Sequence, residues 1–159
     1  MHDGRELIAQ VAHAVRSQRT AVGISQEDLA RRAGLHRTYL SAVEAGKRNV
    51  TIKTLTRIAE ALGASLPTLL DGREATMPDG SKHQLGPSVQ QLRKERGLSQ
   101  LELARASKLH RSYICGVEIG RRNPRLLNVA QLAAALGVPV AALFDRHFRE
   151  REASYSEEP

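Results

Sequence analysis

The side chains best suited to a specific chemistry here are two arginines, each followed by a hydroxyl residue. Arg37 precedes Thr38, and Arg111 precedes Ser112. A guanidinium can donate paired hydrogen bonds to O6 and N7 of guanine, and a hydroxyl can bond a base edge or touch a thymine methyl group. The sequence contains no G-x-S-x-G, P-loop, H-E-x-x-H or metal-spaced Cys/His motif. These residues therefore indicate recognition of double-stranded DNA rather than catalysis, with no metal and no cofactor.

Both pairs belong to an internal repeat with an offset of 74 residues. The string ISQEDLAR at residues 24–31 recurs as LSQLELAR at residues 98–105, and the register holds without a gap from 15–71 to 89–145. Two copies indicate a duplicated domain, because a solenoid needs at least three stacked units. The predicted organisation is a first domain at 1–71, a linker rich in turn residues at 72–87, a second domain at 88–145 and a charged tail at 146–159.

Composition and charge favour a helical protein with a polyanionic partner. The 159 residues carry a net charge of +7, and only 3% are aromatic, which suits short packed helices better than a β-sandwich. The positive excess favours nucleic acid first and an anionic membrane second. The sequence has no apolar run long enough to span a bilayer, its first residues do not resemble a signal peptide, and Cys115 is its single cysteine. We therefore expect a soluble cytoplasmic protein, associated with the nucleoid and not with a membrane.

Apolar residues at helical spacing predict five helices in each copy, and so an all-α fold. In the first copy we expect helices at about 5–21, 25–32, 36–45, 51–62 and 66–70. Ser25 with Asp28, and Ser99 with Glu102, have the spacing of a capping box. A short helix, a tight turn containing glycine and a second short helix form the helix-turn-helix pattern. The pattern occurs twice, each time with three supporting helices.

Several separated motifs carry a resemblance to a known family. The strings GISQEDLARRAG at 23–34, VEAGKRN at 43–49 and IAEALG at 58–63 resemble the phage-repressor/Cro-type (XRE-type) helix-turn-helix family. The stretch HRTYLS at 36–41 is similar to controller proteins of restriction–modification systems in particular. The resemblance covers about 57 residues of each copy and implies two lambda-repressor-like domains. Members of that type are usually single modules that pair as homodimers, whereas this chain carries both modules covalently.

In this motif the second helix, called the reading helix below, lies in the major groove, with its N-terminal side chains on base edges. Leu40 and Val43 must share the core-facing side, because they are three residues apart. The residues expected on the opposite, DNA-facing side are Arg37, Thr38, Ser41 and Ala42 in the first copy, and Arg111, Ser112, Cys115 and Gly116 in the second. We interpret Cys115 as a small residue that fits against DNA rather than as a redox switch.

Other side chains are candidates for phosphate contacts, which position a module without reading sequence. Gln26 and Gln100 open the first helix of each pair, and the resemblance implies that their side chains bond phosphate. The loop after each reading helix supplies Lys47, Arg48, Asn49, Arg121, Arg122 and Asn123. Tyr39 and Tyr113 either donate to phosphate or pack. His36 and His110 are expected to cap the reading helices or contact the DNA backbone rather than bind metal.

The resemblance also implies a structural ion pair in each copy. In the family an arginine of the first helix bonds the glutamate that closes the reading helix. The matching residues here are Arg19 with Glu44 and Arg93 with Glu118. Their expected role is to orient the reading helix.

These features predict a sequence-specific transcriptional regulator of repressor or controller type. A linker of about 16 residues reaches roughly 50 Å, and half-sites one helical turn apart are about 34–36 Å from centre to centre, so one chain could cover a pseudo-palindromic site. Whether one chain or a homodimer is the binding unit stays open, as does whether RNA polymerase is occluded or recruited. The alternative is an antitoxin or adaptor in which one module binds DNA and the other binds a protein.

Overall fold

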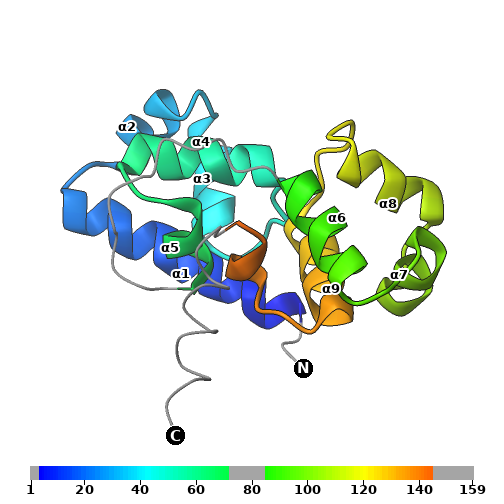
Figure 1. Cartoon of the computed structure of the whole chain (residues 1–159). Helices are drawn as coiled ribbons and strands as arrows, with labels where there is room; N and C mark the ends of the chain where they lie inside the picture. Colours follow the sequence, from blue (N-terminus) through cyan, green and yellow to red (C-terminus); the bar gives the residue numbers. More distant parts are fainter. Residues whose placement is uncertain (1–3, 72–84, 145–159) are drawn as a thin grey trace, which may run out of the picture.

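A computed structural model of the chain describes residues 4–71 and 85–144, and every element within those ranges is helical apart from one isolated bridge. The first module contains α1 (Gly4–Val22), α2 (Gln26–Arg32), α3 (Arg37–Glu44), α4 (Ile52–Leu62) and α5 (Leu66–Asp71). The second contains α6 (Leu85–Glu95), α7 (Gln100–Ser107), α8 (Arg111–Glu118), α9 (Leu126–Leu136) and the 3-10 helix η1 (Val140–Leu143) (Figure 1). The all-α prediction with two tandem helix-turn-helix modules is confirmed.

The second module begins earlier than the sequence pattern predicts. Residues 85–87, which the sequence pattern assigns to the linker, form the first turn of α6. The rest of that linker and the predicted tail at 146–159 lie outside the described residues. None of the described helices is both long and apolar enough to cross a bilayer.

The N-termini of α2 and α7 are capped by equivalent serines, but only one forms the expected capping box. Ser99 accepts a hydrogen bond from the backbone N–H of Glu102, whose carboxylate accepts one from the N–H of Ser99 at 2.7 Å. Ser25 likewise accepts from the N–H of Asp28, yet its hydroxyl donates to the Asp28 carboxylate at 2.8 Å. Aspartate is one methylene shorter than glutamate, so its carboxylate bonds the serine hydroxyl instead of the backbone N–H. The reciprocal box predicted at Ser25 is therefore wrong in this detail.

The two modules have the same core, built from aliphatic side chains at matching positions of the repeat. Leucine, isoleucine and valine, with no aromatic ring among them, fill the centre of each helix cluster. The fully buried matching positions are Val15, Leu29, Leu40, Leu55, Ile58 and Leu69 in the first module, and Val89, Leu103, Ile114, Val129, Leu132 and Leu143 in the second. Burying such side chains stabilises each by roughly 1.5–3 kcal/mol, and the helix-turn-helix pair is held on this core.

The modules also pack against each other, and part of this contact joins equivalent residues of the repeat. Thr51 and Arg125, which are 74 positions apart, form an isolated antiparallel bridge. Helix α1 of the first module contacts α9 of the second, and α5 contacts η1. The bridge joins a residue to its own repeat equivalent, as in the self-complementary interface of a two-fold homodimer. The chain is thus arranged as an intramolecular pseudo-dimer.

The turn between α7 and α8 contains the one described non-glycine residue with a positive φ. Lys108 has a φ of 56°, where the first module has Gly34 at 61°. The left-handed conformation costs a residue with a Cβ about 1–2 kcal/mol, and glycine costs about 0.4–1 kcal/mol in unfolded-state entropy. We therefore expect Lys108→Gly to raise the free energy of unfolding by on the order of 0.5–1 kcal/mol, measured by urea denaturation. Lys108→Ala is the control, since it removes the charge but keeps the strain; equal stability of the two variants would contradict the prediction.

Candidate nucleic-acid interface

The exposed side of α3 begins with a capped turn. His36 is the N-cap residue, and its Nδ1 accepts from the backbone N–H of Thr38 at 3.4 Å and lies 2.7 Å from the Thr38 hydroxyl. Arg37, Thr38 and Ser41 are exposed, while Leu40 on the opposite side is fully buried. The helix thus presents a guanidinium and two hydroxyl groups to solvent, as required for contact with base edges.

Helix α8 repeats this surface with differences. Arg111 and Ser112 are exposed and Cys115 is half-buried. His110 occupies the N-cap position without a side-chain hydrogen bond, unlike His36. Among the residues that the structure describes, no three His, Cys, Asp or Glu side chains are grouped so as to hold a metal ion.

Gly116 is the position of α8 that departs most from expectation. The sequence pattern places it on the exposed side, but it is buried. A Cβ built on Gly116 would lie 2.7 Å from Cγ of Arg122, so the Arg122 side chain covers this position. The first module has the half-buried Ala42 here. The two reading surfaces therefore differ at this position in how closely the following loop approaches the helix.

An ion pair connects α1 to the end of α3. Nε and Nη2 of Arg19 donate to the two carboxylate oxygens of Glu44 at 2.7 and 3.0 Å, and Nη1 donates to the backbone oxygen of Ile24 at 2.9 Å. The side chain of Gln26 donates to the same carboxylate at 2.8 Å. Helix α3 is thus tied to α1 and to the start of α2 through one buried carboxylate.

The second module repeats this ion pair and buries it more deeply. Arg93 donates to both oxygens of Glu118 at 2.6 and 3.0 Å, Gln100 donates at 3.0 Å, and the Glu118 side chain has no exposed surface. Burial raises the pKa of Glu118, but the hydrogen bonds from Arg93 and Gln100 outweigh it and hold the pKa below its usual value. Hydrogen bonding to Glu118 also raises the pKa of Arg93. Both groups are charged at neutral pH, so the pair orients α8 through charged hydrogen bonds.

Gln26 and Gln100 are therefore not isolated polar side chains. Each amide nitrogen already donates one hydrogen bond to the glutamate of the ion pair. A primary amide carries two N–H donors, which leaves one for another acceptor. Their contact with phosphate stays a prediction.

The loops after the reading helices place cations over tyrosine rings. The guanidinium carbon of Arg48 lies 5.4 Å from the centroid of the Tyr39 ring, and that of Arg122 lies 5.9 Å from Tyr113, both within cation–π range. Burial raises the pKa of Tyr113, with Arg122 opposing it, so the hydroxyl is protonated and can donate. Lys47 and Arg121 are exposed in the same loops. The positive charge of these exposed side chains suits binding to the phosphate backbone of DNA.

Asn49 and Asn123 differ from their neighbours in these loops. The side-chain oxygen of Asn49 accepts from the backbone N–H of Leu127 at 3.2 Å, and that of Asn123 accepts from Lys53 at 3.1 Å. Each asparagine therefore reaches into the opposite module. Sequence reasoning placed both on phosphate and missed the contact between modules. One residue in the sequence points to this contact. Arg125 stands at the N-cap position of α9, where serine, threonine, aspartate or asparagine is expected.

The family comparison agrees with both copies of this arrangement. A family model described as helix-turn-helix matches residues 15–69 and again 89–143. The chain belongs to the helix-turn-helix family. The XRE-type resemblance inferred from the sequence is thereby confirmed, and membership makes the chain a DNA-binding transcriptional regulator.

Individual relatives are control proteins and repressors. Control protein C.SmaI of Serratia marcescens is 48% identical over 68 residues, covering 43% of this chain and 77% of that protein. Control protein C.BamHI of Bacillus amyloliquefaciens is 40% identical over 67 residues, covering 42% of this chain and 80% of that protein. The immunity repressor of Bacillus phage phi105 is 36% identical over 74 residues, covering 45% of this chain and 51% of that protein. The crystal structure of the restriction-modification controller protein C.AhdI of Aeromonas hydrophila is 45% identical, covers 39% of this chain and 94% of that chain, and has a TM-score of 0.38. These names describe regulators and not enzymes.

Proposed function

We propose that a single chain binds a pseudo-palindromic DNA operator, with α3 in the major groove of one half-site and α8 in that of the other. The supporting observation is the packing of the two modules through equivalent residues, since the bridge joins Thr51 to its repeat equivalent Arg125. A two-fold related pair of reading helices matches an operator with inverted half-sites. The covalent pseudo-dimer then does within one chain what two separate modules would do as a pair.

Within each half-site, the roles follow from side-chain chemistry. Arg37 and Arg111 bond guanine, and the hydroxyls of Thr38 and Ser112 bond a neighbouring base or methyl group. Lys47 and Arg121, with the other loop cations, bind phosphate and orient the module. The surfaces differ at Thr38/Ser112, Ser41/Cys115 and Ala42/Gly116. The half-sites are therefore similar but not identical.

The regulatory role proposed from the relatives is that of a controller or repressor. Two control proteins and a phage repressor share 36–48% identity with this chain over about one module. A protein bound across a promoter changes transcription by occluding RNA polymerase or by recruiting it. The proposal covers both outcomes, because they depend on where the operator lies relative to the promoter.

Selection of bound duplexes from a random DNA library tests this function. We expect enriched sequences to contain two inverted, similar half-sites at one constant separation, about 34–36 Å or 10–10.5 base pairs from centre to centre. Enrichment of a single half-site, or of no sequence, would contradict the proposal. The selection is best done at two salt concentrations, because the phosphate contribution weakens steeply with salt and the base preference does not.

A further inference from the structure

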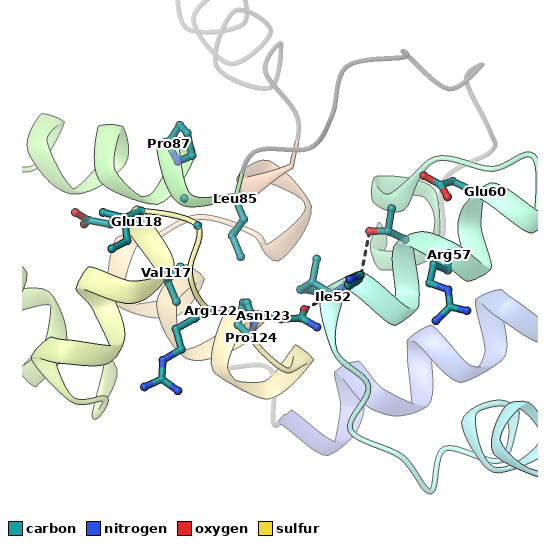
Figure 2. Close-up of a pocket in the computed structure, with 15 residues that line it drawn as sticks. Ile52, Arg57, Glu60, Leu85, Pro87, Val117, Glu118, Arg122, Asn123 and Pro124 are labelled. Atoms are coloured by element: carbon teal, nitrogen blue, oxygen red, sulfur yellow. Dashed lines mark hydrogen bonds between the residues drawn. The ribbon is translucent and has the colours of Figure 1, made fainter. Parts of the chain in front are cut away.

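Helix α4 begins with two backbone donors that the second module satisfies. The first four N–H groups of a helix have no partner within it. The N–H of Ile52 donates to the backbone oxygen of Pro124 at 2.9 Å, and that of Lys53 donates to the side-chain oxygen of Asn123 at 3.1 Å. Figure 2 shows Asn123 and Pro124 beside Ile52 at this junction. Without the second module, both donors would need another acceptor.

Helix α9 begins in the same way, with the partners exchanged. The N–H of Leu126 donates to the backbone oxygen of Val50 at 2.8 Å, and that of Leu127 donates to the side-chain oxygen of Asn49 at 3.2 Å. The N-cap residue Arg125 has a side chain that makes no cap hydrogen bond. Asn49 therefore supplies, from the other module, the acceptor that an N-cap residue normally provides.

These four hydrogen bonds allow a single register between the modules. Val50 and Leu126, at the centre of the contact, are only 2% and 1% exposed. Sliding one module along the other by a residue would move the donors away from their acceptors. Ile52 and Leu126, whose N–H groups donate to backbone oxygens of the opposite module, are buried. An unpaired buried N–H is costly, so the contact has one preferred geometry rather than a range of geometries.

The junction is directly connected to the reading helices. Helix α3 ends at Glu44, five residues before Asn49, and α8 ends at Glu118, five residues before Asn123. In each loop a backbone hydrogen bond closes the turn, from Lys47 to Ala42 at 3.0 Å in the first module. A junction with one geometry, connected through short closed loops, holds the two reading helices at one separation.

We propose that Asn49 and Asn123 are positioning residues that set the spacing between the two half-sites. The inference rests on the proposed binding of two half-sites by one chain. The asparagines act by holding the modules in register, so the protein accepts one half-site spacing and rejects its neighbours. Changing the spacing by two base pairs moves one half-site about 7 Å along the DNA and turns it roughly 70° around the axis, which a fixed pair of helices cannot follow.

The test compares the wild type with N49A/N123A on a series of operators whose central spacing varies from two base pairs shorter to two longer. Fluorescence anisotropy at constant salt gives the affinities. We expect the wild type to lose about tenfold or more in affinity at the ends of the series, because one module loses its base contacts. The double variant should show a flattened profile, with the ends within about threefold of the centre. The single variants N49A and N123A, which keep more of the junction, should give intermediate profiles and serve if the double variant does not fold.

K47A/R121A is the matched control, since it changes two exposed loop cations at equivalent repeat positions. It should weaken binding by a similar factor at every spacing and leave the shape of the profile unchanged. The same uniform loss in N49A/N123A would overturn the proposal in favour of phosphate contact, and an unchanged profile would also overturn it. The proposed function fails separately, if the wild type binds no two-half-site operator more tightly than a single half-site.

Discussion

Replacing Arg93 with alanine is expected to lower the free energy of unfolding by about 3–5 kcal/mol. The substitution leaves Glu118 buried without its cation, and the Glu118 side chain has no exposed surface. Gln100 would still donate one hydrogen bond, which cannot replace a bidentate guanidinium. Urea denaturation followed by circular dichroism measures the change.

The expected pH dependence identifies the cause of this loss. The pKa of Glu118 is lowered in the folded protein, so the stabilisation by the ion pair is fully present above the unfolded value of about 4.3. It is lost as the pH falls through the lower, folded pKa. The difference in stability between wild type and Arg93→Ala should therefore be constant near neutral pH and shrink in acid.

Two further variants separate charge burial from loss of packing. Arg93→Ala combined with Glu118→Gln should be more stable than Arg93→Ala alone, because the buried group is then neutral. Lys94→Ala changes an exposed cation on the same helix and should alter stability by no more than about 0.5 kcal/mol. A loss of less than about 1 kcal/mol in Arg93→Ala would show that the pair does not hold α8 as argued.

Replacing Arg37 or Arg111 with alanine is expected to weaken operator binding by about 1–3 kcal/mol each, roughly 5- to 150-fold. Both side chains are exposed at the first position of their reading helices, so the folded state should not change. Each variant should also relax base preference at its own half-site, while Lys47→Ala weakens binding to all sequences alike. Both effects are measured by titrating each variant with the operator and with operators in which one half-site or the other carries exchanged base pairs.

The two arginines also distinguish the regulator from an adaptor. A pseudo-dimer on DNA needs both, so both single variants must lose affinity for the complete operator. A loss in only one variant would mean that one module binds DNA while the other has a different partner. Unfolding midpoints measured on the same samples would show that any loss concerns binding and not stability.

The sequence by itself determined the repeat, the helical fold of each copy and, apart from Gly116, the exposed face of each reading helix. These features depend on the spacing of apolar residues and on local capping groups, which lie within a few residues of one another. Leu40 and Ile114 are buried, and Arg37 and Arg111 are exposed, because helical geometry leaves little choice once the core face is set. The Arg19–Glu44 and Arg93–Glu118 pairs followed from the family resemblance rather than from spacing.

The tertiary structure alone decided how the two copies meet. Asn49 is an ordinary polar loop residue in the sequence, and its partner, the N–H of Leu127, is 78 positions away and carries no side-chain signature. Gly116 is buried because the side chain of Arg122 lies against α8 at this position. Asp28 bonds the Ser25 hydroxyl because the aspartate side chain is short. The contact between the modules depends on backbone groups brought together by folding, and backbone donors are the same at every residue. A sequence can therefore specify the two reading modules, while the register between them emerges only when their helix ends are placed against each other.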